Sequence, residues 1–161
     1  PNLSTNFNQN LKWIINSKID LIYLKRENIL ETLISQIEHL MRFNPKRFRQ
    51  IAKKVDQNKV YITNFQEFLN RYNQIDENQF KKLKKIESSN INFFSTTYED
   101  LCEDTQKVIT NICNFLGVPA HKINKDKTTK KMASGYLQLH ERIINSDELI
   151  VFLYKKGVLK F

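Results

Sequence analysis

Hydrophobic residues gather along the chain into two strand-like runs, and a helical pattern follows each run. The first run covers residues 19–25, where Leu21, Ile22 and Leu24 predict a buried strand. The second run, residues 91–97, is rich in the aromatic and β-branched residues that favour strands. Because each predicted strand leads into a helix, the pattern predicts an α/β fold in which helices cover a sheet.

The helical patterns have clear start and stop signals. Residues 27–43 repeat hydrophobic side chains at three- and four-residue intervals, and Asn44-Pro45 is expected to end this helix. After the second strand, Asp104 can cap a helix that Gly117 ends. Two further helices are expected near the chain ends: residues 10–16, and a helix capped by Asn145 or Ser146 that ends at Gly157.

Residues 44–90 separate the two predicted strands and are basic and polar. Residues 60–62 suggest a short strand, and the hydrophobic spacing of residues 65–72 and 80–86 predicts two helices. We interpret this stretch as a helical insertion. The length of 161 residues suits one domain, so the chain is expected to form a single domain over residues 1–161.

Composition narrows the class of protein. Hydrophobic residues make up 40% of the chain, and three glycines and three prolines are too few for a disordered or low-complexity sequence. The net charge of +9 favours an anionic partner, such as nucleic acid, a phosphorylated cofactor or an acidic membrane surface, although a solubilising surface explains it equally well. Lysine runs at residues 81–85 and 122–131 are typical of a solvated helix face or an exposed loop.

Several other classes find no support in the sequence. Cys102 and Cys113 have neither the spacing nor the histidine neighbours of a metal site, so no metal is expected. Two free thiols suit a reducing cytoplasm. No hydrophobic run approaches the roughly 20 residues of a membrane-spanning helix. The sequence also has no glycine-rich phosphate loop or serine-hydrolase motif.

Arg26 is the first candidate for chemistry. It directly follows the first predicted strand, at the edge where open α/β sheets bind their ligands. Its guanidinium group can bind a phosphate through two parallel hydrogen bonds. The alternative is a surface arginine that pairs with Glu27 or Glu31.

Ser35 and Tyr98 are weaker candidates. Ser35 lies opposite the hydrophobic stripe of the 27–43 helix, so it faces either a ligand or solvent. Tyr98 follows the second strand, where its ring can stack on a base or simply complete the core. Glu99 and Asp100 point to opposite sides of an extended chain and form no catalytic pair, so helix capping or ion pairing is the better interpretation.

Three segments, in this order and separation, resemble the C-terminal two-thirds of the sulfotransferase domain. They are LIYLKRENILETLIS, STTYEDLCEDTQKVITNICNFLGV and KKMASGYLQLHERIINSDELIVFL. Members of that family transfer a sulfuryl group from 3′-phosphoadenosine 5′-phosphosulfate (PAPS). The resemblance implies a P-loop-NTPase-like parallel sheet flanked by helices, present here as an incomplete, helix-rich domain.

The resemblance also implies roles for individual residues. Arg26 and Ser35 would bind the 3′-phosphate of PAPS, or of its desulfated product adenosine 3′,5′-bisphosphate (PAP), and Tyr98 would contact the adenine. A basic loop further along would approach the nucleotide through Lys130 or Lys131, of which Lys131 is the candidate. Nine positions separate Arg26 from Ser35. That is one more than in the best-known cytosolic members and resembles bacterial carbohydrate-type relatives. Carbohydrate, lipid and small phenol stay open as acceptors, and the resemblance to the family favours a carbohydrate.

Two family features have no counterpart in residues 1–18: the loop that binds the 5′-phosphosulfate, and the usual histidine or glutamate base. We therefore expect a truncated sulfotransferase that is inactive or nearly so, with no identified catalytic residue. Three alternatives stay open: a basic nucleic-acid-binding module, a nucleotide-kinase-like P-loop protein, and a non-catalytic interaction domain descended from the enzyme. No nucleic-acid partner is expected, because no recognised binding motif occurs.

Overall fold

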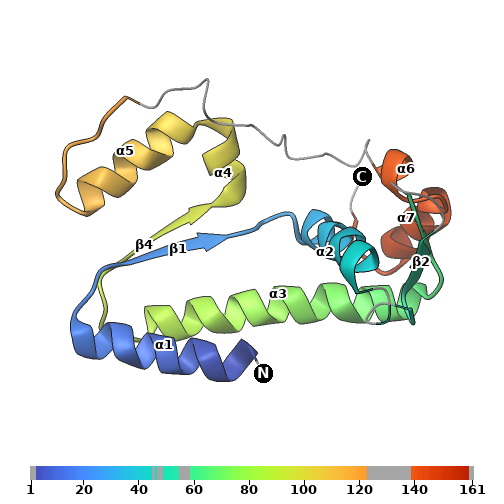
Figure 1. Ribbon diagram of the computed structural model, residues 1–161, viewed down its shortest axis with the longest axis horizontal. Coiled ribbons are helices and arrows are strands. Elements are labelled where there is room, and N and C mark those ends of the chain that lie inside the picture. The colour runs from blue at the N-terminus through green and yellow to red at the C-terminus, as the bar shows by residue number, and fades with distance from the viewer. Residues whose placement is uncertain (1–2, 45, 47–48, 55–58, 123–138, 160–161) are drawn as a thin grey trace. The chain divides into compact units, whose positions relative to one another are not determined.

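The computed structural model describes residues 3–44, 46, 49–54, 59–122 and 139–159 (Figure 1). The chain divides into two compact units, each with its own packing. The first unit combines Pro1–Glu27 with Asn78–Met132, and the second combines Asn28–Glu77 with Ala133–Phe161.

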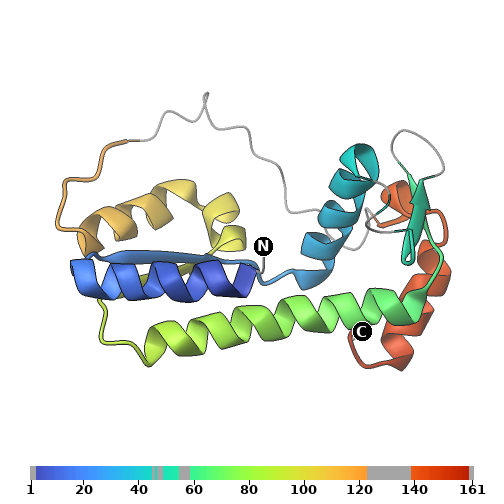
Figure 2. The ribbon, with the colours of Figure 1, turned by 60° about the horizontal axis from the view of Figure 1, so that its bottom comes forward.

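The first unit contains the parallel sheet. Strands β1 (Leu21–Lys25) and β4 (Phe93–Thr97) pair in register from Leu21 opposite Phe93 to Lys25 opposite Thr97. Figures 1 and 2 show helices α1 (Leu3–Ser17) and α5 (Thr105–Phe115) on opposite sides of this sheet. The predicted α/β class, a parallel sheet flanked by helices, is confirmed.

The expectation that β1 is buried was wrong for one of its faces. Ile22 and Leu24 are 39% and 48% exposed, whereas their neighbours along the strand are half-buried. Alternate residues of a strand point to opposite faces, and a continuous hydrophobic run does not reveal that one face stays exposed. The described part of the chain offers β1 one strand partner, β4.

Local signals explain where the helices after β4 begin and end. Thr97 caps the short helix α4 (Tyr98–Glu103), because its hydroxyl oxygen accepts the Asp100 N–H at 2.9 Å. Asp104 caps α5 by accepting the Lys107 N–H at 3.0 Å, which confirms the predicted cap. Gly117 has a φ of +67°, the left-handed conformation that ends a helix.

The second unit is a layer of helices packed around a small hairpin. It contains α2 (Ile29–Phe43), the antiparallel strands β2 (Ala52–Lys54) and β3 (Val60–Ile62), α6 (Leu139–Arg142) and α7 (Ser146–Lys155). Hydrophobic side chains from all of these elements and from α3 (Phe65–Glu87) form one buried cluster. Its fully buried members include Leu33, Ile37, Phe68, Leu149 and Leu153.

Helix α3 corrects the prediction of two helices between residues 65 and 86. It is one helix of 23 residues, of which those up to Glu77 belong to the second unit and the rest to the first. No glycine or proline interrupts it, and the i,i+4 pair of Arg71 with Glu67 supports its exposed face. The polar residues between its two hydrophobic stretches suggested a break, but the helix continues through them.

Candidate functional site

The register of the sheet brings Arg26 and Tyr98 together. Lys25 pairs with Thr97 at the end of the two parallel strands, so the next residue of each strand emerges at the same edge. The Arg26 guanidinium carbon lies 3.9 Å from the centre of the Tyr98 ring. Both residues are half-buried. Two residues that the sequence marked separately therefore form one feature at the carboxyl edge of the sheet.

Hydrogen bonds fix the turn that carries Arg26. The Arg26 N–H donates to the side-chain oxygen of Gln79 at 3.1 Å, and the Glu27 N–H donates to the Glu99 carboxylate at 3.0 Å. Glu99 thus ties the ends of the two strands together and does not cap a helix; Thr97 caps α4. These two hydrogen bonds stabilise the turn.

The Arg26 side chain makes no ion pair with any residue that the structure describes. Glu27 pairs with Lys25 at 3.4 Å, and Glu31 pairs with Arg142 at 2.7 Å, so neither carboxylate considered from the sequence neutralises Arg26. A guanidinium that stacks on a ring keeps its N–H groups available around its edge. Arg26 can therefore offer two parallel donors to an anion.

Tyr98 stays uncharged at neutral pH. A hydrogen bond with the Cys102 side chain and partial burial raise the pKa of its hydroxyl above the usual 10, although the nearby Arg26 acts in the opposite direction. The site therefore combines one unneutralised cation with a neutral aromatic ring. Such a pair suits a ligand that has both a phosphate and a flat heterocycle.

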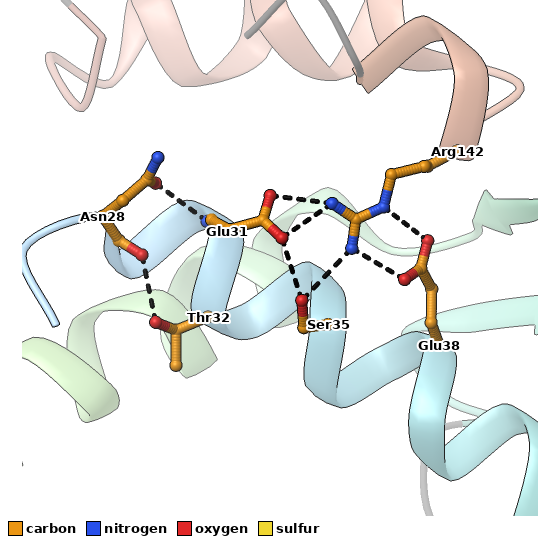
Figure 3. A network of polar contacts seen from close by, with 6 residues as sticks. All are labelled: Asn28, Glu31, Thr32, Ser35, Glu38 and Arg142. Carbon is orange, nitrogen blue, oxygen red and sulfur yellow. Dashed lines mark hydrogen bonds and ion pairs between the residues drawn. The ribbon is translucent and has the colours of Figure 1, made fainter. Parts of the chain in front are cut away.

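Ser35 takes part in a polar network of the second unit (Figure 3). Its hydroxyl donates to a Glu31 carboxylate oxygen at 2.9 Å and accepts an N–H of Arg142 at 3.2 Å. Asn28 caps α2 and fixes the turn that carries Glu31, because its side-chain oxygen accepts the Glu31 N–H at 2.9 Å. Ser35 lies away from the core, as predicted, but its hydroxyl is already engaged.

Arg142 is the network residue that sequence reasoning missed. It projects from α6 and forms 2.7 Å contacts with both oxygens of Glu31 and of Glu38. The hydrogen bonds that Arg142 donates to Glu38 and Glu31 raise the Arg142 pKa above its ordinary value, and burial opposes them. The spacing of Glu31, Ser35 and Glu38 places all three on one face of α2. That spacing was the sequence feature that could have indicated a shared partner.

Lys131 and its neighbour Lys130, the predicted nucleotide contacts of the basic loop, lie outside the described residues. Within the described ranges, no cluster of three or more histidine, cysteine, aspartate or glutamate side chains could hold a metal ion. Likewise, none of the described helices is long and apolar enough to cross a membrane.

His140, Ser146 and Asp147 resemble a catalytic triad in composition but not in geometry. The Ser146 hydroxyl and the Asp147 carboxylate both approach the same ring nitrogen of His140, Nδ1, at 2.8 Å and 3.4 Å. A triad needs the base to contact the nucleophile through one nitrogen and the carboxylate through the other. These residues therefore do not form an activated nucleophile.

Comparison with known proteins supplies the family. The family model of the sulfotransferase domain matches residues 5–158 of the sequence, which is nearly the whole chain. No curated protein and no solved structure gave a significant match. A match of this extent also agrees with the parallel sheet, the helices on both of its sides and the order of the three sequence segments. The chain belongs to the sulfotransferase domain family, whose members transfer sulfuryl groups to an acceptor.

Proposed function

We propose that this sulfotransferase uses PAPS as its donor and that Arg26 binds the 3′-phosphate of the nucleotide. The observation that carries the proposal is the Arg26 guanidinium at the carboxyl edge of the parallel strands, stacked on Tyr98 and without an ion pair among the described residues. Open α/β sheets bind their ligands at this edge. A phosphate would supply the negative charge that neutralises the Arg26 guanidinium.

The chemistry of these residues fits an adenosine 3′-phosphate. The guanidinium group matches the spacing of two phosphate oxygens, and the neutral Tyr98 side chain offers both a stacking face and a hydroxyl to an adenine. When bound, PAPS supplies the sulfuryl group that is transferred. Arg26 and Tyr98 act on the nucleotide by binding and orienting it, and the hydrogen bonds from the Arg26 and Glu27 N–H groups hold the turn for that task.

Two further contacts follow from the family motif. Ser35 is assigned to the same phosphate, and Lys131 of the basic loop to the nucleotide. Ser35 would then exchange its bond with Glu31 for one with a phosphate oxygen. A carbohydrate is the proposed acceptor, by resemblance to carbohydrate-type members of the family.

Isothermal titration of the full chain with PAP and with adenosine 5′-monophosphate tests the Arg26 assignment, because the second ligand lacks the 3′-phosphate. Hydrogen bonds to a charged partner contribute about 1.5–3 kcal/mol, so Arg26→Ala should weaken PAP binding about 10- to 100-fold. The monophosphate should bind the variant and the wild type equally well. The loss would then belong to the 3′-phosphate.

Arg71→Ala is the matched control for this titration. Arg71 is an exposed arginine on α3 that pairs with Glu67, so its removal changes the net charge by the same amount without touching the candidate site. We expect it to leave PAP affinity within about twofold of the wild type. Equal affinity of the wild type for PAP and the monophosphate, or an equal loss for both ligands in Arg26→Ala, would refute the assignment.

A further inference from the structure

Glu31 occupies an anion-binding arrangement inside the protein. One of its carboxylate oxygens accepts the Ser35 hydroxyl at 2.9 Å, and both oxygens accept N–H groups of Arg142 at 2.7 Å (Figure 3). A hydroxyl and a guanidinium that converge on one carboxylate are the same kinds of donor that bind a phosphate. The ligand of these donors is at present a side chain of the protein itself.

The network is partly buried, so its charges interact more strongly than they would in water. The side chains of Arg142, Glu31 and Glu38 are 18%, 14% and 21% exposed. Two carboxylates face one guanidinium, so the ionised network has an excess of one negative charge. An incoming phosphate would meet the Glu31 carboxylate as a like charge, and the energy of such repulsion grows as the surroundings lose water.

We propose that Glu31 is a built-in competitor for phosphate at Ser35. Its carboxylate holds the Ser35 hydroxyl and the Arg142 guanidinium until the 3′-phosphate of the donor displaces it, and Glu38 keeps Arg142 in place throughout. This inference rests on the proposed function, since it concerns the phosphate that Ser35 is assigned to bind.

A purely structural network would behave differently. If Glu31 and Glu38 served only to tie α6 to α2 through Arg142, the two glutamates would be equivalent and neutralising either would leave nucleotide affinity unchanged. Glu38 separates the two cases, because it contacts the same guanidinium but makes no bond to Ser35. Glu38→Gln is therefore the matched control for Glu31→Gln.

The experiment is titration of the full-length variants with PAP and with adenosine 5′-monophosphate at fixed ionic strength. Glu31→Gln removes a like charge beside the phosphate, so it should tighten PAP binding about three- to tenfold. Glu38→Gln should give a much smaller gain in affinity. Monophosphate affinity should not change in either variant. In a Ser35→Ala background, Glu31→Gln should lose most of its gain, because the hydroxyl that it releases is absent.

The outcomes separate the two proposals. Wild-type protein that does not prefer PAP to the monophosphate overturns the proposed function itself. A preserved PAP preference and Arg26 dependence, together with no gain in Glu31→Gln or an equal gain in Glu38→Gln, overturns only the competitor role. Should Glu31→Gln fail to fold by circular dichroism, Glu31→Asp decides, since it keeps the charge near Arg142 but shortens the reach to Ser35. Its affinity for PAP should then exceed that of the wild type, and an unchanged or weaker affinity would refute the proposal.

Discussion

Two tyrosines of the first unit, Tyr23 and Tyr98, hold their hydroxyl protons more tightly than free tyrosine does. Burial raises the pKa of Tyr23, whose hydroxyl lies 3.4 Å from the Gln79 carbonyl oxygen. For Tyr98 the main cause is the hydrogen bond with Cys102. Both hydroxyls are therefore neutral in the folded protein at a pH where they would ionise in the unfolded chain.

This difference predicts a loss of stability in alkali. A group whose pKa is raised by folding contributes its full stabilisation below the unfolded value near 10, and that contribution disappears as pH rises through the folded pKa. The free energy of unfolding in urea should therefore fall as pH rises above about 10, and that of Tyr23→Phe should fall less steeply. Tyrosinate absorbance measures independently how far the ionisation of the two tyrosines is delayed in the folded protein. An equally steep fall in Tyr23→Phe would contradict the assigned pKa shift.

Arg26 and Tyr98 were predictable from sequence, whereas Arg142 was not. The first two are marked by their position directly after a strand, and one parallel pairing suffices to bring them together. Arg142 lies 111 positions from Glu31, and its role depends on the packing of α6 against α2. Local patterns do not encode such a contact, so the sequence did not single out Arg142.

At the scale of elements, Asn145 extends the small hairpin with its side chain. Its amide group donates to the Ile62 carbonyl and accepts the Ile62 N–H, both at 2.9 Å, in the manner of a neighbouring strand. The adjacent Ile144 N–H donates to the Val60 carbonyl at 3.0 Å. The residues before α7 therefore satisfy the outer edge of β3, and Asn145 is 7% exposed.

Asn145→Ala should destabilise the protein more than an ordinary polar substitution. It leaves the N–H and the C=O of Ile62 without their partner in a buried position, at a cost of about 2–4 kcal/mol. The midpoint and slope of urea unfolding measure the change. Asn73→Ala, at an exposed position of α3 in the same unit, should change stability by no more than about 0.5 kcal/mol. Similar losses for both variants would show that the side-chain bridge contributes little.

The elements with an uninterrupted hydrophobic or strand-favouring pattern were the most predictable ones, for a physical reason. Helix α2 repeats its hydrophobic positions over four turns, and β4 concentrates residues that favour strands, so both gave clear patterns. Strand β2 and helices α4 and α6 span three, six and four residues, which is too short to establish a period. Asn145 or Ser146 was expected to cap α7, and Asn145 does occupy the N-cap position. Its side-chain amide, however, bonds to Ile62 and makes no capping bond.

At the scale of the whole molecule, the two units differ in how much hydrophobic surface they bury. The second unit has a continuous cluster that draws on every one of its described helices and strands. In the described part of the first unit, the buried hydrophobic residues are Leu11, Ile86 and Val108, while Ile22 and Leu24 remain exposed. Sequence composition did not reveal this division, because hydrophobic residues are frequent in both units and α3 is continuous between them.

This difference predicts two levels of local stability, which native-state hydrogen exchange on the intact chain can measure. Helices α2 and α5 make a matched comparison, since α2 buries Leu33, Ile34 and Ile37 almost completely and α5 buries only Val108. After correction for intrinsic rates, the amides of α2 should exchange at least about tenfold more slowly than those of α5, because local opening of α2 exposes more hydrophobic surface. Binding of PAP should slow exchange in α4 and β4 if Tyr98 contacts the nucleotide, because a ligand stabilises the elements that hold it. Equal protection of α2 and α5 without ligand would mean that the chain opens as one cooperative body, and the division into two units would then have no energetic counterpart.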